Sequence, residues 1–423
     1  MAVTLGNWAH SFKTKDETTD IVEASLKIGR IGLNLLRMME PKAPIEYRLT
    51  SIKTLADLCM TVGLSLESMN RPMACLEYLD RAEQHYKQYM DRMPFVSDQD
   101  RIICESMYEY CRGKEAEAWY RMVNDIPEKD RANYLLFSKS YLVHSLIRLS
   151  LMGNEEFVKD LRNVMHDVDI LSEKYGMPDA SIIENELFPK DVDEYRLWCF
   201  DKVLIINFYC EVPSLQAEHL EDEVTFELDG KDRIIMDDVL ASFDHCRRIL
   251  FRFSGLSPEE LIAKGRDEDV EYLIDCHIRL YSVLDKFAKI IRTVSGLDCN
   301  LNGFWEIGEE LKNNRNPYLK AISMIKEDLF PDKEAKMGNY EDPHLMYAQA
   351  YYQTSFIRNH IVHDAFRIAD PGEENYIEAG VAALKAADLH YQTMTLAYTV
   401  REAIMLLQMA VEYGKREGGK PSH

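Results

Sequence analysis

Five polar side chains that can bind a phosphate or move a proton lie within seven residues of one another, late in the chain. They are Arg358, Asn359, His360, His363 and Asp364. Histidine exchanges protons near neutral pH because its ordinary pKa is roughly 6.5. Arginine stays charged, and its planar fork can bind two phosphate oxygens at once. This composition favours phosphate chemistry assisted by proton transfer.

The surrounding stretch, about residues 343–368, is predicted to form one helix. Residues four apart share a helix face, so Asn359 stacks on His363, and His360 on Asp364. Arg358 precedes His363 by five residues, which separates their α-carbons by roughly 140° around the axis. Only a long side chain can bridge that offset. A single copy of the helix is therefore expected to be an incomplete site that a second copy completes.

Cleavage of RNA without a metal ion would use groups of these types. A base takes the proton of the 2'-hydroxyl, an acid protonates the leaving oxygen, and a cation neutralises the phosphate. Histidine suits the proton transfers, arginine suits the charge, and an amide can orient a phosphate oxygen or the ribose. Two copies of the helix, facing each other across a two-fold axis, would double the set.

Simpler interpretations of the same residues stay open. Arg358 can form a surface or interface ion pair, and His360 and His363 can be ordinary residues of a helix face. A metal site is a further alternative, because His360, His363 and Asp364 place two ligands on one face. A third ligand is not evident in the sequence nearby, so we expect neither a metal nor another cofactor.

The motif resembles the signature of the HEPN superfamily, in which an arginine is followed after four residues by histidine, here with asparagine in second place. The preceding stretch Leu280–Ile291 resembles the earlier HEPN helix. Phe304 and Trp305, then residues 317–329, the motif helix and residues 391–411 follow in a similar order. The resemblance covers residues 236–423.

Membership would imply a helical bundle, and many HEPN domains are metal-independent endoribonucleases that act as homodimers with a composite cleft. Arg358 and His363 would then be the catalytic pair, with Asn359 as their supporting polar residue. His360, Asp364 and Asp285 are candidates for supporting roles.

Many HEPN enzymes are toxins or antiviral defence effectors. Toxins that pair with nucleotidyltransferase antitoxins carry tyrosine two residues after the motif histidine. This chain has Ala365 there, so we do not expect silencing by nucleotidylation of that tyrosine.

The N-terminal part, residues 1–220, is predicted to be an antiparallel helical array. Ala74 and Ala82, with Tyr78 and Tyr86, have the small and aromatic spacing of tetratricopeptide helices. A constant period of roughly 34 residues cannot be fixed, so an irregular helical domain is the alternative. We expect this array to be a sensor or scaffold that binds a protein or ligand trigger.

Between the two parts, residues 221–235 are predicted to form a linker or a small β-hairpin. Residues 223–235 alternate in character, and Asp229-Gly230 is a hairpin turn signal. The C-terminal domain would then span residues 236–423.

The composition fits an all-α fold. Of 423 residues, 46% are hydrophobic and 29% charged, with only 19 glycines and 14 prolines. The net charge of −22 opposes a broad nucleic-acid surface but allows a recessed site. Nine cysteines without a CxxC pair, no signal-peptide pattern and no apolar run of bilayer length favour a cytoplasmic protein with no membrane association.

Motifs of other chemistries are missing from the sequence. It has no Walker lysine loop, no GxGxxG after a strand, no GxSxG elbow and no HExxH. The sequence therefore predicts a metal-independent, homodimeric HEPN endoribonuclease with RNA as its substrate. The alternative is a non-catalytic helical-repeat scaffold whose HEPN-like domain only dimerises.

Overall fold

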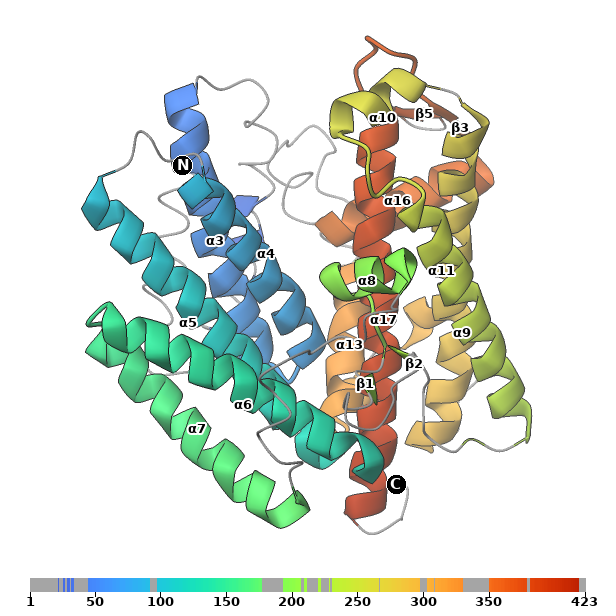
Figure 1. Ribbon diagram of the computed structural model, residues 1–423. Helices are drawn as coiled ribbons and strands as arrows, with labels where there is room; N and C mark the ends of the chain where they lie inside the picture. Colours follow the sequence, from blue (N-terminus) through green and yellow to red (C-terminus); the bar gives the residue numbers. More distant parts are fainter. Residues whose placement is uncertain are drawn as a thin grey trace. The chain divides into compact units, whose positions relative to one another are not determined.

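The structure is a computed structural model that divides into two compact units (Figure 1). The first comprises residues 1–192 and 207–224, and the second comprises residues 193–206 and 225–423. The residues that the structure describes are 45–91, 97–176, 193–206, 209–210, 220–221, 228, 230–265, 267–296, 303–307, 309–329, 350–378 and 381–417, with a few positions between 22 and 33.

The first unit is a series of helices in which each contacts the next along the chain. They are α3 (Ile45–Ser68), α4 (Pro72–Asp91), α5 (Asp98–Met122), α6 (Glu128–Leu151) and α7 (Glu155–Tyr175). The aromatic and small residues expected to nest the helices, Tyr78, Tyr86, Ala74 and Ala82, are buried. On α5, a Cβ added at Gly113 would overlap the side chain of Leu161, so this glycine lets α7 pack closely on α5.

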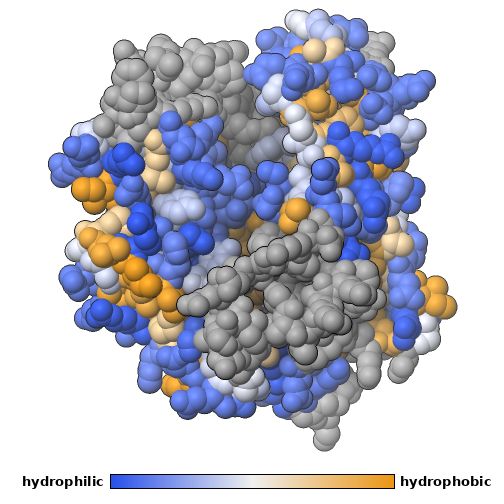
Figure 2. Space-filling model, in the orientation of Figure 1, coloured by the Kyte–Doolittle hydropathy of each residue, from blue (hydrophilic) through white to orange (hydrophobic). Residues whose placement is uncertain are grey.

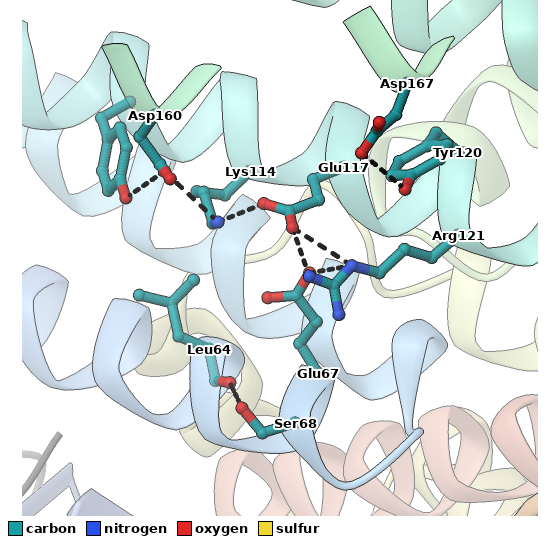
Figure 3. A network of polar contacts seen from close by, with 10 residues as sticks. Leu64, Glu67, Ser68, Lys114, Glu117, Tyr120, Arg121, Asp160 and Asp167 are labelled. Atoms are coloured by element: carbon teal, nitrogen blue, oxygen red, sulfur yellow. Dashed lines mark hydrogen bonds and ion pairs between the residues drawn. The ribbon is translucent and has the colours of Figure 1, made fainter. Parts of the chain in front are cut away.

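Helix α5 carries charged side chains into the interior of this unit. Lys114 pairs with Glu117 of its own helix and, at 3.5 Å, with Asp160 of α7. Arg121 pairs with Glu117 and, at 3.1 Å, with Glu67 of α3 (Figure 3). Because a buried charge is tolerated when it is paired, these contacts join three helices through one polar network.

Two further carboxyl groups, Glu83 of α4 and Glu115 of α5, are buried with too little positive charge nearby to offset their burial. Burial raises the pKa of Glu83 on α4 to about 8, against the opposing charge of Arg112. Burial also raises the pKa of Glu115 well above its ordinary value, and the nearby Glu83 and Asp80 carboxyl groups add to the shift. The interior of the first unit therefore favours neutral carboxyl groups at these positions.

The described helices of the second unit comprise one short helix before residue 230 and several from residue 230 onward. They are α8 (Glu194–Asp201), α9 (Gly230–Phe251), α10 (Pro258–Lys264), α11 (Glu268–Ser295), the 3-10 turn η5 (Phe304–Glu306), α12 (Glu309–Lys312), α13 (Pro317–Leu329), α16 (Ala350–His363) and α17 (Ala386–Arg416). Helix α17 contacts α9, α10, α11, α13 and α16, and every residue from Thr395 to Ala410 is buried. It is therefore the central helix of this unit (Figure 1).

Residues 193–206 belong to the second unit, although their sequence pattern places them with the N-terminal array. Two buried arginines hold this segment: Arg401 donates to the carbonyl of Val203, and Arg247 donates to that of Leu204 at 3.0 Å. Such contacts join residues far apart in the chain and cannot be inferred from local periodicity.

The all-α prediction is confirmed, and a two-stranded antiparallel sheet is present. Its strands are β1 (Tyr209–Cys210) and β2 (Leu220–Glu221), so it lies earlier than the predicted 223–235 segment. Residues 230–235 instead begin α9, where Gly230 has φ of 50°. Residues 222–227 and 229 lie outside the described residues.

A second, three-stranded sheet was not predicted. Its strands are β3 (Ala365–Ile368), β4 (Tyr376–Glu378) and β5 (Val381–Leu384). Strand β5 is central, parallel to β3 and antiparallel to β4. The helix expected over residues 343–368 is therefore shorter, because 365–368 are strand, while 343–349 lie outside the described part of the chain.

In the described residues, no helix is both long enough and apolar enough to cross a membrane.

The buried acid of α4 gives a testable prediction. Because the pKa of Glu83 is raised from 4.5 to about 8 on folding, its contribution to stability is complete below pH 4.5 and is lost as the pH rises to about 8. Glu83→Gln removes this loss. We expect the variant to melt a few degrees higher than wild type at pH 8.5 and at the same temperature at pH 4.5, since about 1 kcal/mol moves Tm by roughly 2–4 °C.

Thermal unfolding followed by circular dichroism at both pH values measures this. Glu173→Gln, an exposed position on α7, is the matched control and should leave the pH dependence unchanged. A Glu83→Gln protein that loses stability equally at both pH values would contradict the burial argument.

Candidate active site

Four of the five motif residues lie in the last two turns of α16, and Asp364 directly follows the helix. Ile357 and His360 are 3% and 4% exposed, whereas Asn359 and His363 are exposed and Arg358 is partly buried. The helix contacts α11, α13 and α17, so it is held by its apolar side. The predicted common face of Asn359 and His363 therefore faces outward.

Arg358 joins the two exposed motif residues. Its Nη1 donates to Asn359 Oδ1 at 3.1 Å and lies 3.3 Å from His363 Nε2. The arginine side chain thus spans the five-residue offset within one copy of the helix. Guanidinium nitrogens only donate, so the contact is a hydrogen bond in the His363 tautomer that carries its proton on Nδ1.

His360 and Asp364 form a second pair at the same helix end. His360 Nδ1 lies 3.0 Å from Asp364 Oδ2, and the Asp364 backbone N–H donates to the His360 carbonyl at 3.1 Å. His360 is buried, while the Asp364 side chain is about one-third exposed. The backbone hydrogen bond closes the last turn of α16, which is the turn that carries His363.

Asp285 of α11 has a contact in a different part of the fold. Its Oδ1 accepts the backbone N–H of Phe304 at 3.0 Å, at the start of η5, and Phe304 is buried. This hydrogen bond gives Asp285 a structural role, in addition to the supporting role expected from the sequence.

Two cations near the motif were missed by sequence reasoning. Arg367 lies in β3, four residues after His363, and Lys385 precedes α17. The alternation of Ala365-Phe366-Arg367-Ile368, exposed and less exposed in turn, is the signal that would have indicated a strand with Arg367 on its outer face.

His360, His363 and Asp364 were also considered as possible metal ligands. Across the described ranges, no group of three or more His, Cys, Asp or Glu side chains is arranged to hold a metal ion. His360 lies next to Asp364, and His363 lies next to Arg358.

Comparison with known proteins identifies part of the second unit. Residues 263–414 match the family model described as LA2681-like HEPN. The matched region begins in α10 and ends in α17, and it includes α11, α16 and the three-stranded sheet. No curated protein and no solved structure gives a significant match to the chain.

The contact of Asp285 generates a test of its role. Asp285→Ala removes the acceptor of the Phe304 N–H and should lower the free energy of unfolding by about 1–2 kcal/mol. Asp285→Asn keeps an acceptor oxygen and should cost less. Chemical denaturation of the two variants measures the difference.

If Asp285→Ala unfolds like wild type, the hydrogen bond to Phe304 does not stabilise the fold. Any loss of activity in that variant would then assign Asp285 to the site itself.

Proposed function

We propose that this protein, whose C-terminal domain belongs to the HEPN superfamily, is a metal-independent endoribonuclease. The observation that carries the proposal is the 3.3 Å contact between Arg358 and His363 on an exposed helix end. It brings together a permanent cation, which can neutralise the phosphate, and an imidazole, which can take the 2'-hydroxyl proton in RNA cleavage by internal attack.

In the proposed reaction, an entering phosphate takes over the guanidinium of Arg358. This exchange frees Nε2 of His363 to take the proton of the 2'-hydroxyl. The 2'-oxygen then bonds to phosphorus, and the bond from phosphorus to the 5'-oxygen breaks. An acid protonates the leaving oxygen, which yields a 2',3'-cyclic phosphate and a 5'-hydroxyl. Asn359, already bonded to Arg358, orients the guanidinium and a phosphate oxygen.

One imidazole cannot be the base and the acid in the same step, and this supports a homodimer. In a dimer with the two α16 ends facing each other, His363 of one protomer is the base and His363 of the other is the acid. The hydrogen bond from the Asp364 N–H to the His360 carbonyl supports this role by closing the helix turn that presents His363.

The biological role that we propose is that of a toxin or antiviral effector, with the first unit as its sensor or scaffold. An apolar row on α6, formed by Val143, Ile147 and Leu151, is 43%, 57% and 77% exposed. Figure 2 shows hydrophobic residues gathered on the first unit, on the side where α5 and α6 lie in Figure 1. Exposed apolar surface of this kind is typical of partner binding, which supports a protein trigger.

Regulation by nucleotidylation is not part of the proposal. The position that a target tyrosine would occupy is Ala365, the first residue of β3, which pairs with Val381. The methyl side chain of Ala365 has no nucleophilic atom that could accept a nucleotide.

The central test is cleavage of RNA in EDTA. We expect wild type to cut RNA and leave cyclic phosphate ends, and we expect His363→Ala and Arg358→Ala to be about 100- to 10,000-fold slower. His166→Ala, an exposed histidine on α7, is the matched control and should keep full activity. Gel electrophoresis and end-group analysis provide the measurement.

If wild type and His363→Ala are equally inert with every candidate trigger, the enzyme proposal is wrong. The non-catalytic scaffold with a dimerising HEPN domain would then be the better account.

A composite site can be tested by mixing defects. Co-expression of wild-type and His363→Ala chains with different tags gives heterodimers that hold one His363. Because the proposed site uses one His363 as base and the other as acid, we expect these heterodimers to be nearly as inactive as the His363→Ala homodimer. Activity measured after tandem affinity purification decides this, and heterodimers that keep a large share of the wild-type activity would show that each protomer works alone.

A further inference from the structure

The sheet that follows the motif forms an acidic surface beside the candidate site. Between Asp364 and Asp388 the chain has six acidic and only two basic side chains. The two basic residues, Arg367 and Lys385, are both paired with acids. A surface of this charge repels an RNA backbone.

Arg367 stands out because of its position. Strand β3 begins two residues after His363, and Arg367 lies on its exposed face together with Ala365. Four residues of extended chain span at most about 14 Å, which places the α-carbon of Arg367 within that distance of His363 and lets its long side chain extend toward a neighbouring phosphate.

The partner of Arg367 is a carboxylate in the geometry that a phosphate would adopt. Arg367 Nη1 lies 2.6 Å from Glu373 Oε2, and Nη2 lies 3.0 Å from Oε1. Glu373 Oε2 also accepts the backbone N–H of Asp370 at 2.8 Å, which fixes the carboxylate in the turn between β3 and β4. Carboxylate and phosphate oxygens use the same two donors of an arginine.

Replacing Glu373 by an RNA phosphate as the partner of Arg367 should change the stability of the fold little. Both side chains of the Arg367–Glu373 pair are 42% exposed, and exposed ion pairs contribute little to stability. The neighbouring acid, Glu374, holds Lys385 at 2.8 Å in the same way. The turn thus keeps both cations of the sheet occupied while no RNA is bound.

We propose that Arg367 is an RNA phosphate contact next to the cleaved linkage, and that Glu373 occupies its guanidinium until RNA displaces it. This inference rests on the proposed ribonuclease function. It makes Arg367 a residue that governs substrate affinity, and it makes Glu373 an internal competitor of RNA.

The test measures binding separately from cleavage. A fluorescent single-stranded RNA is titrated with full-length protein carrying His363→Ala, and anisotropy is recorded at several salt concentrations. Arg367→Gln should weaken binding and reduce the slope of log Kd against log salt by about 0.7, the value for one lost phosphate contact to a single strand. Glu373→Gln should tighten binding by about two- to five-fold.

The double variant Arg367→Gln/Glu373→Gln separates direct competition from a general change of charge. If Glu373 acts only by occupying Arg367, the double variant should bind RNA as weakly as Arg367→Gln alone. Arg367→Lys, which keeps the charge but loses the fork, should be intermediate. In protein that retains His363 and can cleave RNA, Arg367→Gln should raise KM and leave kcat unchanged.

A matched pair of controls lies at the other end of α17. Arg416 Nε is 3.5 Å from Glu417 Oε1, and about 45 Å of helix separates this pair from the sheet. Arg416→Gln and Glu417→Gln make the same charge changes and should leave RNA binding unaltered.

The inference is overturned if Glu373→Gln does not tighten binding, if its effect persists without Arg367, or if the α17 controls change binding equally. Wild type that cuts RNA while the Arg367 and Glu373 variants bind like their parent would refute this inference alone. Wild type that binds RNA as expected here but never cuts it would refute the proposed function alone.

Discussion

The candidate site depends on the one-sided burial of the last two turns of α16. Ile357 and His360 are buried, and the 3.6-residue period then obliges Asn359 and His363 to face outward. Helix α17 provides much of this support, because it is itself buried on all sides and contacts α16 along with four other helices. A substitution that weakens the packing around α17 would therefore displace the motif residues, although none of them is altered.

In the first unit, the α5 helix places charged side chains in the interior. Charge in this interior is accommodated by pairing, as with Lys114 and Glu117, or by neutralisation, as with Glu83 and Glu115. Buried ion pairs are weak sources of stability but are costly to break. Such an interior favours one specific packing of α3, α4, α5 and α7, which suits the proposed scaffold.

Local periodicity was sufficient to predict the helical fold, the motif helix and the common face of Asn359 and His363. It did not predict the three-stranded sheet, because β3 is held by parallel pairing with β5, as in the Ala365–Val381 pair. Nor did it assign residues 193–206 to the second unit, since Arg247 and Arg401 hold them from distant helices. The contact of Arg358 with His363 required a side-chain conformation that spacing alone left open.

The two arginines beside the helix end share a property that shapes any reaction with RNA. Arg358 is held by Asn359 and His363, and Arg367 by Glu373, so each is occupied by a partner from its own chain. A phosphate that displaces His363 or Glu373 binds by an exchange of hydrogen bonds with a small net gain. Replacing His363 as the partner of Arg358 has a second consequence, because it also releases the lone pair of the base. In the proposed enzyme, substrate binding and activation of the base are therefore one event.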